Sequence, residues 1–267
     1  MCGQRCYELL QRLLESGVNQ QEIKFITPDF NLISDFSVQI KDTYNQLLDL
    51  ISNNPLEDLA ISYNGGKDCL VLLIIYMAAI YSYYGDNHPP VKAVYIHSEP
   101  GFSQQMKFLF ESVKFFKLKF TVVNTYSASP NIGYQNIENL QAERPTLAAG
   151  FETYLKYHPV KMIIAGIRRS DPHGAKLKTR ELTGGNWPKF VRINPILEWN
   201  TAKIWGFIRW FSLHGFKYCS LYDEGYTSLG GRENTIKNPL LKRGDSYLSA
   251  WQIVDDDVER LGRVQKL

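Results

Sequence analysis

Short apolar runs alternate along this chain with segments in which apolar residues recur every three or four positions. This alternation constrains the fold more than any other feature, because the first pattern is typical of buried strands and the second of helices. The predicted strands are Leu59–Tyr63, Val91–Ile96, Phe120–Val123 and Met162–Ala165. The predicted helices between them are Cys69–Tyr84, Ser103–Lys117 and Thr146–Tyr157. The sequence therefore predicts an α/β fold with a mostly parallel sheet and helices on both faces, and such sheets bind ligands at the carboxyl ends of their strands.

The same patterns divide the rest of the chain. Two apolar stripes within residues 1–55 predict N-terminal helices that pack on the core, and residues 56–200 form the α/β core itself. Residues 201–267 are predicted to form a loop-rich C-terminal subdomain. It contains one helix that begins after Asn200 and a last helix over Asp255–Gln265. We expect the three parts to form a single structural unit.

The composition excludes several classes of protein. Of the 267 residues, 44% are hydrophobic and 13% aromatic, which is enough for a large core and excludes a disordered or fibrous chain. A net charge of +3 suits anionic small molecules but is far from the basic excess of proteins that bind long nucleic acids. The longest nearly apolar run, Cys69–Tyr81, is shorter than the roughly 20 residues that span a membrane. The sequence therefore predicts neither a nucleic-acid nor a membrane partner.

The cysteines and the first residues indicate a cytoplasmic location. Cys2, Cys6, Cys69 and Cys219 contain no CxxC pair and the histidines are scattered, so neither a zinc site nor a disulfide framework is expected. The initial run MCGQRCYELLQRLLE is charged and has no apolar stretch, unlike a secretory signal peptide. We expect a cytoplasmic protein.

The segment Ile61-Ser62-Tyr63-Asn64-Gly65-Gly66-Lys67-Asp68-Cys69 joins the first predicted strand to an apolar helix. Paired glycines allow a tight turn whose N–H groups face an anion, and the following helix adds its positive N-terminal end. An ordinary strand-to-helix turn also accounts for paired glycines. The segment is not a Walker loop, because Ile61 and Asp68 stand where that motif needs glycine and Ser or Thr.

Two further strand ends carry polar residues. The run Tyr95-Ile96-His97-Ser98-Glu99-Pro100 offers Glu99 to a ribose hydroxyl or a base, although a polar turn explains the run equally well. The run Gly166-Ile167-Arg168-Arg169-Ser170-Asp171-Pro172 offers arginines for bidentate contacts to phosphate and Asp171 for Mg²⁺. A surface charge run is the alternative. Because this run falls at the same edge of the sheet as the glycine loop, we favour a site.

These motifs resemble those of a known family. The glycine loop resembles the SGGKDS pyrophosphate loop of the N-type ATP pyrophosphatases, with Asn64 replacing the small first residue and Cys69 the final serine. The loop, GIRRSDP, Asn186-Trp187-Pro188 and the runs 192–199 and 222–230 follow in the order seen in eukaryotic, fungal-type FAD synthases (FMN adenylyltransferases) of the PAPS reductase-like family. The resemblance covers about residues 59–267. It implies a Rossmann-like fold of the adenine nucleotide alpha hydrolase type and, we expect, a monomer.

The resemblance also implies a reaction, FMN + ATP → FAD + pyrophosphate, with Mg²⁺ as cofactor. It places ATP on Ser62, Tyr63, Asn64, Gly65, Gly66, Lys67, Asp68, Cys69, Ile96, His97, Glu99, Gly166, Ile167 and Arg168. It places the flavin on Gly184, Gly185, Asn186, Trp187, Arg192 and Arg263. It assigns Mg²⁺ to Asp171 and Asn64, and catalysis to Asn64, Lys67, Asp68, Asp171, Arg260 and Arg263. The family usually carries Asp where this chain has Gly184, so only a backbone contact to the flavin is implied there.

Other functions are compatible with the same motifs. The run Gly225–Gly230 is similar to the GYxSIG element of PAPS reductases, but those enzymes need a catalytic cysteine in the C-terminal tail and no cysteine follows Cys219. A different acceptor of AMP, or an inactive nucleotide-binding module, stays possible. In the favoured reaction no general base is needed, because the FMN phosphate has a second pKa near 6 and is largely a dianion at pH 7.

Overall fold

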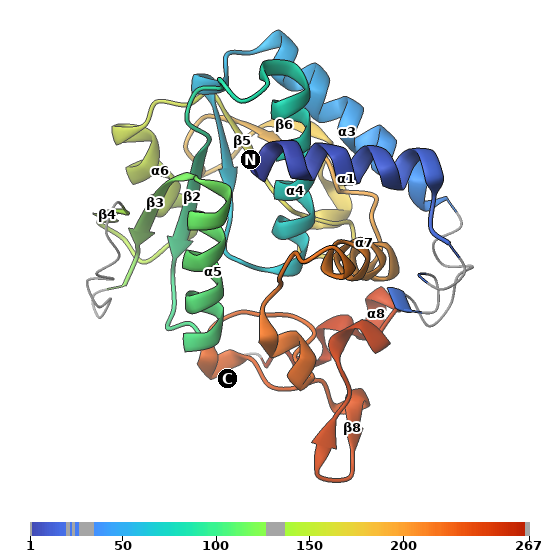
Figure 1. The fold of residues 1–267 in the computed structure, drawn as a ribbon. Coiled ribbons are helices and arrows are strands. Elements are labelled where there is room, and N and C mark those ends of the chain that lie inside the picture. Colours follow the sequence, from blue (N-terminus) through green and yellow to red (C-terminus); the bar gives the residue numbers. More distant parts are fainter. Residues whose placement is uncertain (1, 20–21, 23–24, 27–34, 127–136, 265–267) are drawn as a thin grey trace.

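A seven-stranded sheet forms the centre of the molecule. The structure is a computed structural model, which describes residues 2–19, 22, 25–26, 35–126 and 137–264. The strand order is β4-β3-β2-β1-β5-β7-β6, and every neighbouring pair is parallel except β6 with β7. The strands are β1 (Leu59–Ser62), β2 (Lys92–His97), β3 (Lys119–Asn124), β4 (Glu138–Gln141), β5 (Met162–Ile164), β6 (Arg180–Leu182) and β7 (Val191–Ile193). The mostly parallel α/β sheet predicted from the sequence is confirmed (Figure 1).

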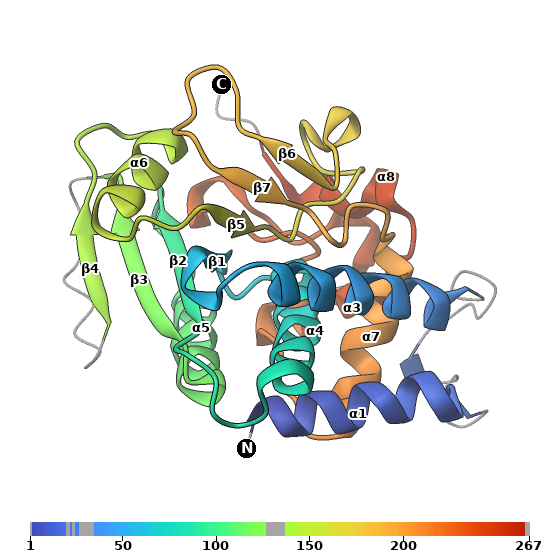
Figure 2. The same ribbon diagram turned by 90° about the horizontal axis from the view of Figure 1, so that it is seen from above.

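Helices cover both faces of this sheet (Figure 2). Successive side chains of β1 point to opposite faces, so Leu59 and Ile61 join the larger apolar cluster with α4, whereas Ala60 joins a smaller cluster with α6. The α-helices are α1 (Cys2–Ser16), α3 (Phe36–Asn53), α4 (Lys67–Tyr84), α5 (Ser103–Phe116), α6 (Leu147–Tyr157), α7 (Thr201–Leu213) and α8 (Asp256–Glu259). Burial on both faces explains why β1, β3 and β5 are largely apolar, whereas the strands β4 and β6 at the two edges are mostly exposed and polar.

Helix α4 is apolar on every side because other elements surround it. By length and composition it is the one helix among the described residues that could cross a membrane, and 72% of it is buried inside the protein. Helices α1 and α3 both pack on α4, and α1 lies on the side away from the sheet. This position is that of a core helix, and it accounts for the hydropathy of the segment.

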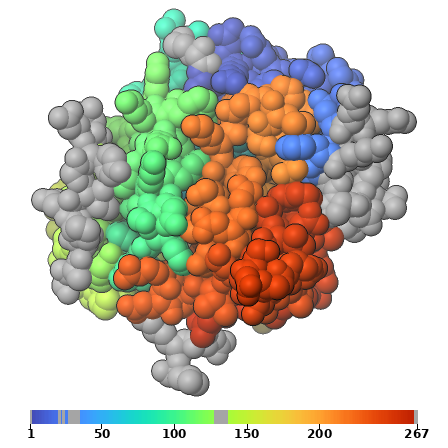
Figure 3. All heavy atoms as spheres, turned by 60° about the horizontal axis from the view of Figure 1, so that its bottom comes forward, coloured from blue at the N-terminus to red at the C-terminus, as the bar shows by residue number. Residues whose placement is uncertain are grey.

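The C-terminal part of the chain lies across the carboxyl edge of the sheet. In Figure 1 the orange and red segments lie on the side toward which β2 and β3 point. After α7 they form a hairpin, β8 (Lys242–Arg243) with β9 (Ser246–Tyr247), and α8. They form a continuous surface with α5, which is green in Figure 3. Short 3-10 turns connect the elements at Leu56–Asp58, Gly174–Lys176, Ser220–Glu224, Arg232–Asn234, Pro239–Leu241, Ala250–Gln252 and Arg260–Gly262.

Two expectations about local structure were wrong. Strands β6 and β7 lie in the stretch 171–198, whose glycines and prolines predicted only loops. Unlike the three-residue strand β5, both contain charged residues, so neither shows an apolar run. The last helix is also shorter than the predicted Asp255–Gln265. It ends at Glu259 and continues only as the turn Arg260–Gly262, and Gln265 lies outside the described residues.

Candidate active site

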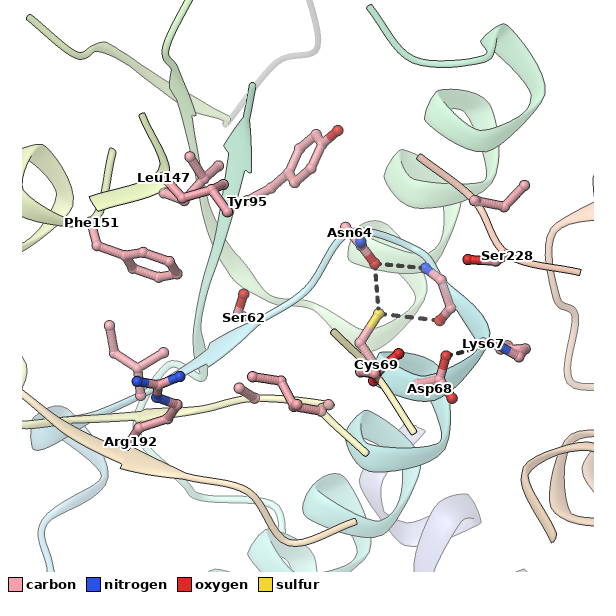
Figure 4. A pocket seen from close by; sticks show the side chains of 18 of the residues that line it. Ser62, Asn64, Lys67, Asp68, Cys69, Tyr95, Leu147, Phe151, Arg192 and Ser228 are labelled. Atoms are coloured by element: carbon pink, nitrogen blue, oxygen red, sulfur yellow. Dashed lines mark hydrogen bonds and ion pairs between the residues drawn. The ribbon is translucent and has the colours of Figure 1, made fainter. Parts of the chain in front are cut away.

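A cavity of about 350 Å³ opens where β1 and β5 end. The strand order reverses between these two strands, because β2 to β4 lie on one side of β1 and β5 to β7 lie on the other. Parallel α/β sheets bind ligands at this point. Figure 4 shows polar side chains from the loop after β1 at one end of the cavity and apolar side chains from β2 and α6 at the other. The polar end holds Ser62, Asn64, Lys67, Asp68, Asp171 and Arg260. The apolar end holds Tyr95, Leu147, Phe151, Trp187, Phe190 and Arg192.

The loop between β1 and α4 is shaped by its own side chains. Gly65 has a φ of +75°, a left-handed conformation that favours glycine. The Asn64 Oδ1 accepts hydrogen bonds from the Gly66 N–H at 2.9 Å and from the Cys69 thiol at 3.0 Å (Figure 4). The Lys67 N–H donates to the Tyr222 hydroxyl at 2.9 Å. The loop is therefore held open around the N-terminal end of α4, as an anion site requires.

Cys69 is a structural thiol in this loop. Burial raises its pKa to about 12, so the side chain is a neutral S–H at physiological pH. Its thiol donates to the Gly66 carbonyl at 3.1 Å as well as to Asn64. This geometry agrees with its predicted part as a replacement for serine.

Lys67, Asp68, Arg168 and Glu259 form a closed ring of ion pairs beneath the polar end. The Lys67 Nζ lies 2.8 Å from Asp68 Oδ2 and 2.7 Å from Glu259 Oε1. The Arg168 Nε lies 2.7 Å from Asp68 Oδ1, and its Nη2 pairs with Glu259 Oε2. Burial alone would raise the pKa of Asp68, but Arg168 and Lys67 outweigh it and hold that pKa below its ordinary value.

Asp171 and Arg260 face each other across the polar end. The Arg260 Nη1 lies 3.3 Å from Asp171 Oδ1, and Asp171 Oδ2 accepts the Arg168 N–H at 2.9 Å. Burial, and next the charge of Asp68, raises the pKa of Asp171. Two carboxylates thus approach each other at the cavity, which is a place suited to a cation.

The apolar end presents flat surfaces. Phe151 packs against Trp187 and Phe190, with ring centroids 5.8 and 5.6 Å apart. The Arg192 guanidinium lies over the Trp187 ring, 5.5 Å from its centroid. This wall of rings with one cation can hold a planar aromatic group next to an anion.

Several residues that the resemblance placed on ATP face elsewhere. His97 is buried and lies 3.3 Å from Asn124 and 3.2 Å from Tyr126. Both Glu99 oxygens accept hydrogen bonds from the C-terminal segment, from Gly231 N–H at 2.7 Å and Asn234 Nδ2 at 2.6 Å. These side chains tie strand β2 to its neighbours and do not line the cavity.

Three further side chains that the resemblance placed on ATP or the flavin also face away from the cavity or are held by other residues. The Tyr63 hydroxyl donates to Ser112 at 2.8 Å in the core, and Arg168 is committed to the ring. The Arg263 guanidinium packs against Gly230, where a Cβ would lie 2.2 Å from it, and it does not line the cavity. Of the predicted flavin residues, Trp187 and Arg192 line the cavity, and Gly184, Gly185 and Asn186 lie in the adjoining turn.

Of the remaining predicted residues, Gly65 faces Leu109 and Phe108, and the others line the cavity. Its lining includes Ser62, Asn64, Gly66, Lys67, Asp68, Cys69, Ile96, Gly166, Ile167, Asp171 and Arg260. Sequence reasoning missed Glu259 and Asp256, although the run Asp255–Glu259 precedes an arginine that it did select. It also missed Phe151 and Leu147 on α6, whose spacing indicates only a helix face.

The sequence of the chain is similar to those of one protein family. Residues 58–237 match the family model of the phosphoadenosine phosphosulfate reductase domain. A probable FAD synthase of Schizosaccharomyces pombe is 34% identical over 213 residues, which are 78% of this chain and 72% of that relative. A probable FAD synthase of Caenorhabditis elegans is 32% identical over 236 residues, which are 86% of this chain. The chain spans about two fifths of the length of that nematode relative, since the match covers 41% of it.

The fold is also similar to that of a solved enzyme. The Candida glabrata FMN adenylyltransferase in complex with FMN and an ATP analogue has a TM-score of 0.79 and 28% identity, over 98% of both chains. The same enzyme in complex with FAD and inorganic pyrophosphate has a TM-score of 0.79. With its parallel sheet, its glycine loop and these relatives, the chain belongs to the phosphoadenosine phosphosulfate reductase domain family, in the fungal-type FAD synthase branch.

Proposed function

We propose that this chain transfers AMP from ATP to the phosphate of FMN, which yields FAD and pyrophosphate. The observation that carries this proposal is the single cavity that joins a phosphate-binding loop to a wall of aromatic rings with Arg192. Adenylyl transfer to FMN needs both ends at once, because a triphosphate and a flat flavin must meet in one site. The relatives named above carry the activity in their names, which supports the same choice.

In this reaction an oxygen of the FMN phosphate attacks the α-phosphorus of ATP. The bond from that phosphorus to the oxygen bridging to the β-phosphorus breaks, and pyrophosphate leaves with the bonding electrons. The nucleophile is already an anion at pH 7, so the site needs to position two negatively charged groups and neutralise them. The N-terminal end of α4, Lys67 and Arg260 supply positive potential at the polar end, where the transferred phosphate must lie.

At the polar end, Asp171 fits Mg²⁺ best. Asn64 Oδ1 accepts the Gly66 N–H and shares the one thiol proton of Cys69 with the Gly66 carbonyl, so its part as a metal ligand stays a prediction. Asp171 lines the cavity, and a cation there would relieve its repulsion by Asp68. Among the described residues no group of three or more acidic, histidine or cysteine side chains is arranged to hold a metal ion, so Mg²⁺ would take most of its ligands from substrate phosphates and water. When bound, Mg²⁺ would neutralise charge on the leaving pyrophosphate.

Thiol chemistry of the reductase kind does not fit the site. Burial raises the pKa of Cys69 to about 12 and that of Cys219 to about 11. Neither thiol is therefore ionised at neutral pH, and a reductase needs a thiolate nucleophile.

The direct test incubates the purified chain with ATP, Mg²⁺ and FMN and separates the flavins by chromatography. We expect FAD and pyrophosphate in equal amounts. Bound ATP without pyrophosphate release would instead mean an inactive nucleotide-binding module, and pyrophosphate release only with another acceptor would mean a different transferase. The variant Trp187→Ala should raise KM for FMN with little change in KM for ATP, because Trp187 lies at the apolar end. The cytoplasmic location and the monomeric state stay predictions, for cell fractionation and light scattering to test.

A further inference from the structure

The ring formed by Lys67, Asp68, Arg168 and Glu259 joins three parts of the chain that are distant in sequence. Lys67 and Asp68 begin α4, Arg168 follows β5, and Glu259 ends α8. Each carboxylate bridges both cations, so the charges alternate around the ring and no member is paired only once. The exposed fractions of Lys67, Arg168 and Glu259 are 3%, 1% and 2%. Asp68 is 20% exposed and lines the cavity, so water reaches the ring only poorly on the Glu259 side.

Glu259 is the ring member that the C-terminal segment contributes. Its backbone carbonyl accepts a hydrogen bond from the Thr227 hydroxyl, and the preceding carbonyl of Val258 accepts one from Asn238 Nδ2 at 2.9 Å. The α8 turn is thus fastened through its main chain as well as through the Glu259 carboxylate. Arg260 follows at once and reaches the cavity beside Asp171.

The ring also determines where the Lys67 ammonium lies. Burial lowers the pKa of Lys67, but Asp68 and Glu259 outweigh that effect and hold it above its ordinary value, so the side chain is charged. Figure 4 shows Lys67 and Asp68 beside each other at the polar end of the cavity. Without Glu259, Asp68 would be the only ring carboxylate beside the ammonium, and its electrostatic attraction would act from one side.

We propose that Glu259 is a positioning residue of the adenylyl-transfer site. Its carboxylate closes the ring and so fixes the Lys67 ammonium and the neighbouring Arg260 guanidinium where the phosphates of ATP bind. Glu259 itself does not line the cavity and acts through these two cations. This inference rests on the proposed function, and it adds a C-terminal carboxylate to a site that otherwise consists of the glycine loop and strand ends.

The test compares Glu259→Gln with two other changes in the same short helix. Glu259→Gln keeps the size of the side chain and removes its charge. Asp257→Asn removes an equal charge at an exposed position. Asp256→Asn removes a carboxylate that lies 2.9 Å from Arg168 Nη1 and does not belong to the ring, so it weakens the anchoring of α8 while the ring stays closed. All proteins are studied well below their unfolding midpoints, so that each is fully folded.

Two readouts separate positioning from general stability. Calorimetry gives the affinity for an ATP analogue with a methylene group between the α- and β-phosphorus, and steady-state kinetics give kcat and KM for ATP and FMN. For Glu259→Gln we expect kcat/KM for ATP to fall about tenfold or more, since charged groups would be misplaced at the phosphates. The KM for FMN should change less than about twofold, and Asp256→Asn and Asp257→Asn should keep kcat/KM for ATP within about threefold.

The outcomes are distinct. Glu259→Gln with normal kcat/KM for ATP overturns the inference. So does a fall in kcat/KM that is equal for ATP and FMN. The inference also fails if Asp256→Asn lowers kcat/KM for ATP as Glu259→Gln does, with both losses following the fall in unfolding midpoint. Should Glu259→Gln not fold, Glu259→Asp keeps the charge but shortens the reach by one methylene, and the same loss toward ATP with unchanged FMN is expected. A wild-type chain that makes no FAD contradicts the proposed function alone, because the affinity for the ATP analogue still tests Glu259.

Discussion

Gly166 lies so close to Cys69 that a Cβ on Gly166 would stand 2.9 Å from the Cys69 amide nitrogen and 3.0 Å from its Cα. Gly166 follows β5, and Cys69 lies in the first turn of α4, the helix that follows β1. The contact therefore brings the end of β5 against the start of α4. The obstructing atoms belong to the main chain and cannot rotate away. Gly166 and Cys69 both line the cavity, so this contact forms part of its wall.

Gly166→Ala should therefore damage both stability and ATP binding. Overpacking of this kind costs about 1–3 kcal/mol, and it would push the first turn of α4 away from the cavity. Urea unfolding and titration with an ATP analogue measure the two effects. Gly184→Ala is the matched control, since a Cβ there would meet nothing within 4 Å and its φ is not positive. Equal stability of the two variants would contradict the close approach.

Asp171→Asn should abolish most FAD formation without making the protein less stable. Burial and Asp68 raise the pKa of Asp171 above its ordinary value of 3.8, so ionisation of this group opposes folding. The neutral amide keeps an oxygen that can accept the Arg168 N–H. As pH rises from 3.8 through the folded-state pKa, the wild type should lose stability relative to the variant, and above that pKa the difference should be constant.

Unfolding by urea at a series of pH values, together with a flavin assay, checks this expectation. Asp245→Asn, at an exposed position in the β8–β9 hairpin, is the control and should change neither property. Near-normal turnover by folded Asp171→Asn would remove Asp171 from the metal site. A variant that is much less stable than the wild type at pH 7 would contradict the raised pKa.

Lys67→Met should cost far more stability than Lys161→Met. Lys67 is buried between two carboxylates, and removal of one partner from a buried ion pair costs about 3–5 kcal/mol. Lys161 lies 2.7 Å from Asp58, but its side chain is 71% exposed, and such pairs contribute at most about 1 kcal/mol. Denaturant unfolding of both variants gives the comparison. Similar losses would mean that solvent reaches the ring.

Cys69→Ser should keep activity within about threefold, because a hydroxyl can donate to Asn64 Oδ1 and the Gly66 carbonyl as the thiol does. Cys69→Val removes the donor and should weaken ATP binding. In the native protein Cys69 should resist alkylation at pH 8, because burial raises its pKa to about 12. Mass spectrometry after brief treatment with iodoacetamide measures this. Rapid modification of Cys69 would show that the loop opens to solvent.

The local pattern of the sequence was sufficient for the central strands, for α4 to α7 and for the edge of the sheet where the site lies. Each of these depends on neighbours in the chain: apolar runs, three- and four-residue spacing, and Gly65-Gly66 before Lys67. The same local signals could not find β6 and β7, because charged residues interrupt both strands and leave no apolar run. Nor did they reveal that the last helix stops at Glu259.

The assignment of individual side chains was decided only by the tertiary structure. Arg168 and Glu99 carry the right chemistry for phosphate and ribose, yet partners distant in the chain hold both, Glu259 for the first and Gly231 and Asn234 for the second. A buried charge must be paired, and which partner reaches it depends on how the segments pack and not on sequence spacing. The sequence therefore determined where the site lies and what class of ligand it takes. Packing decided which charges face the cavity and which close the ring beneath it.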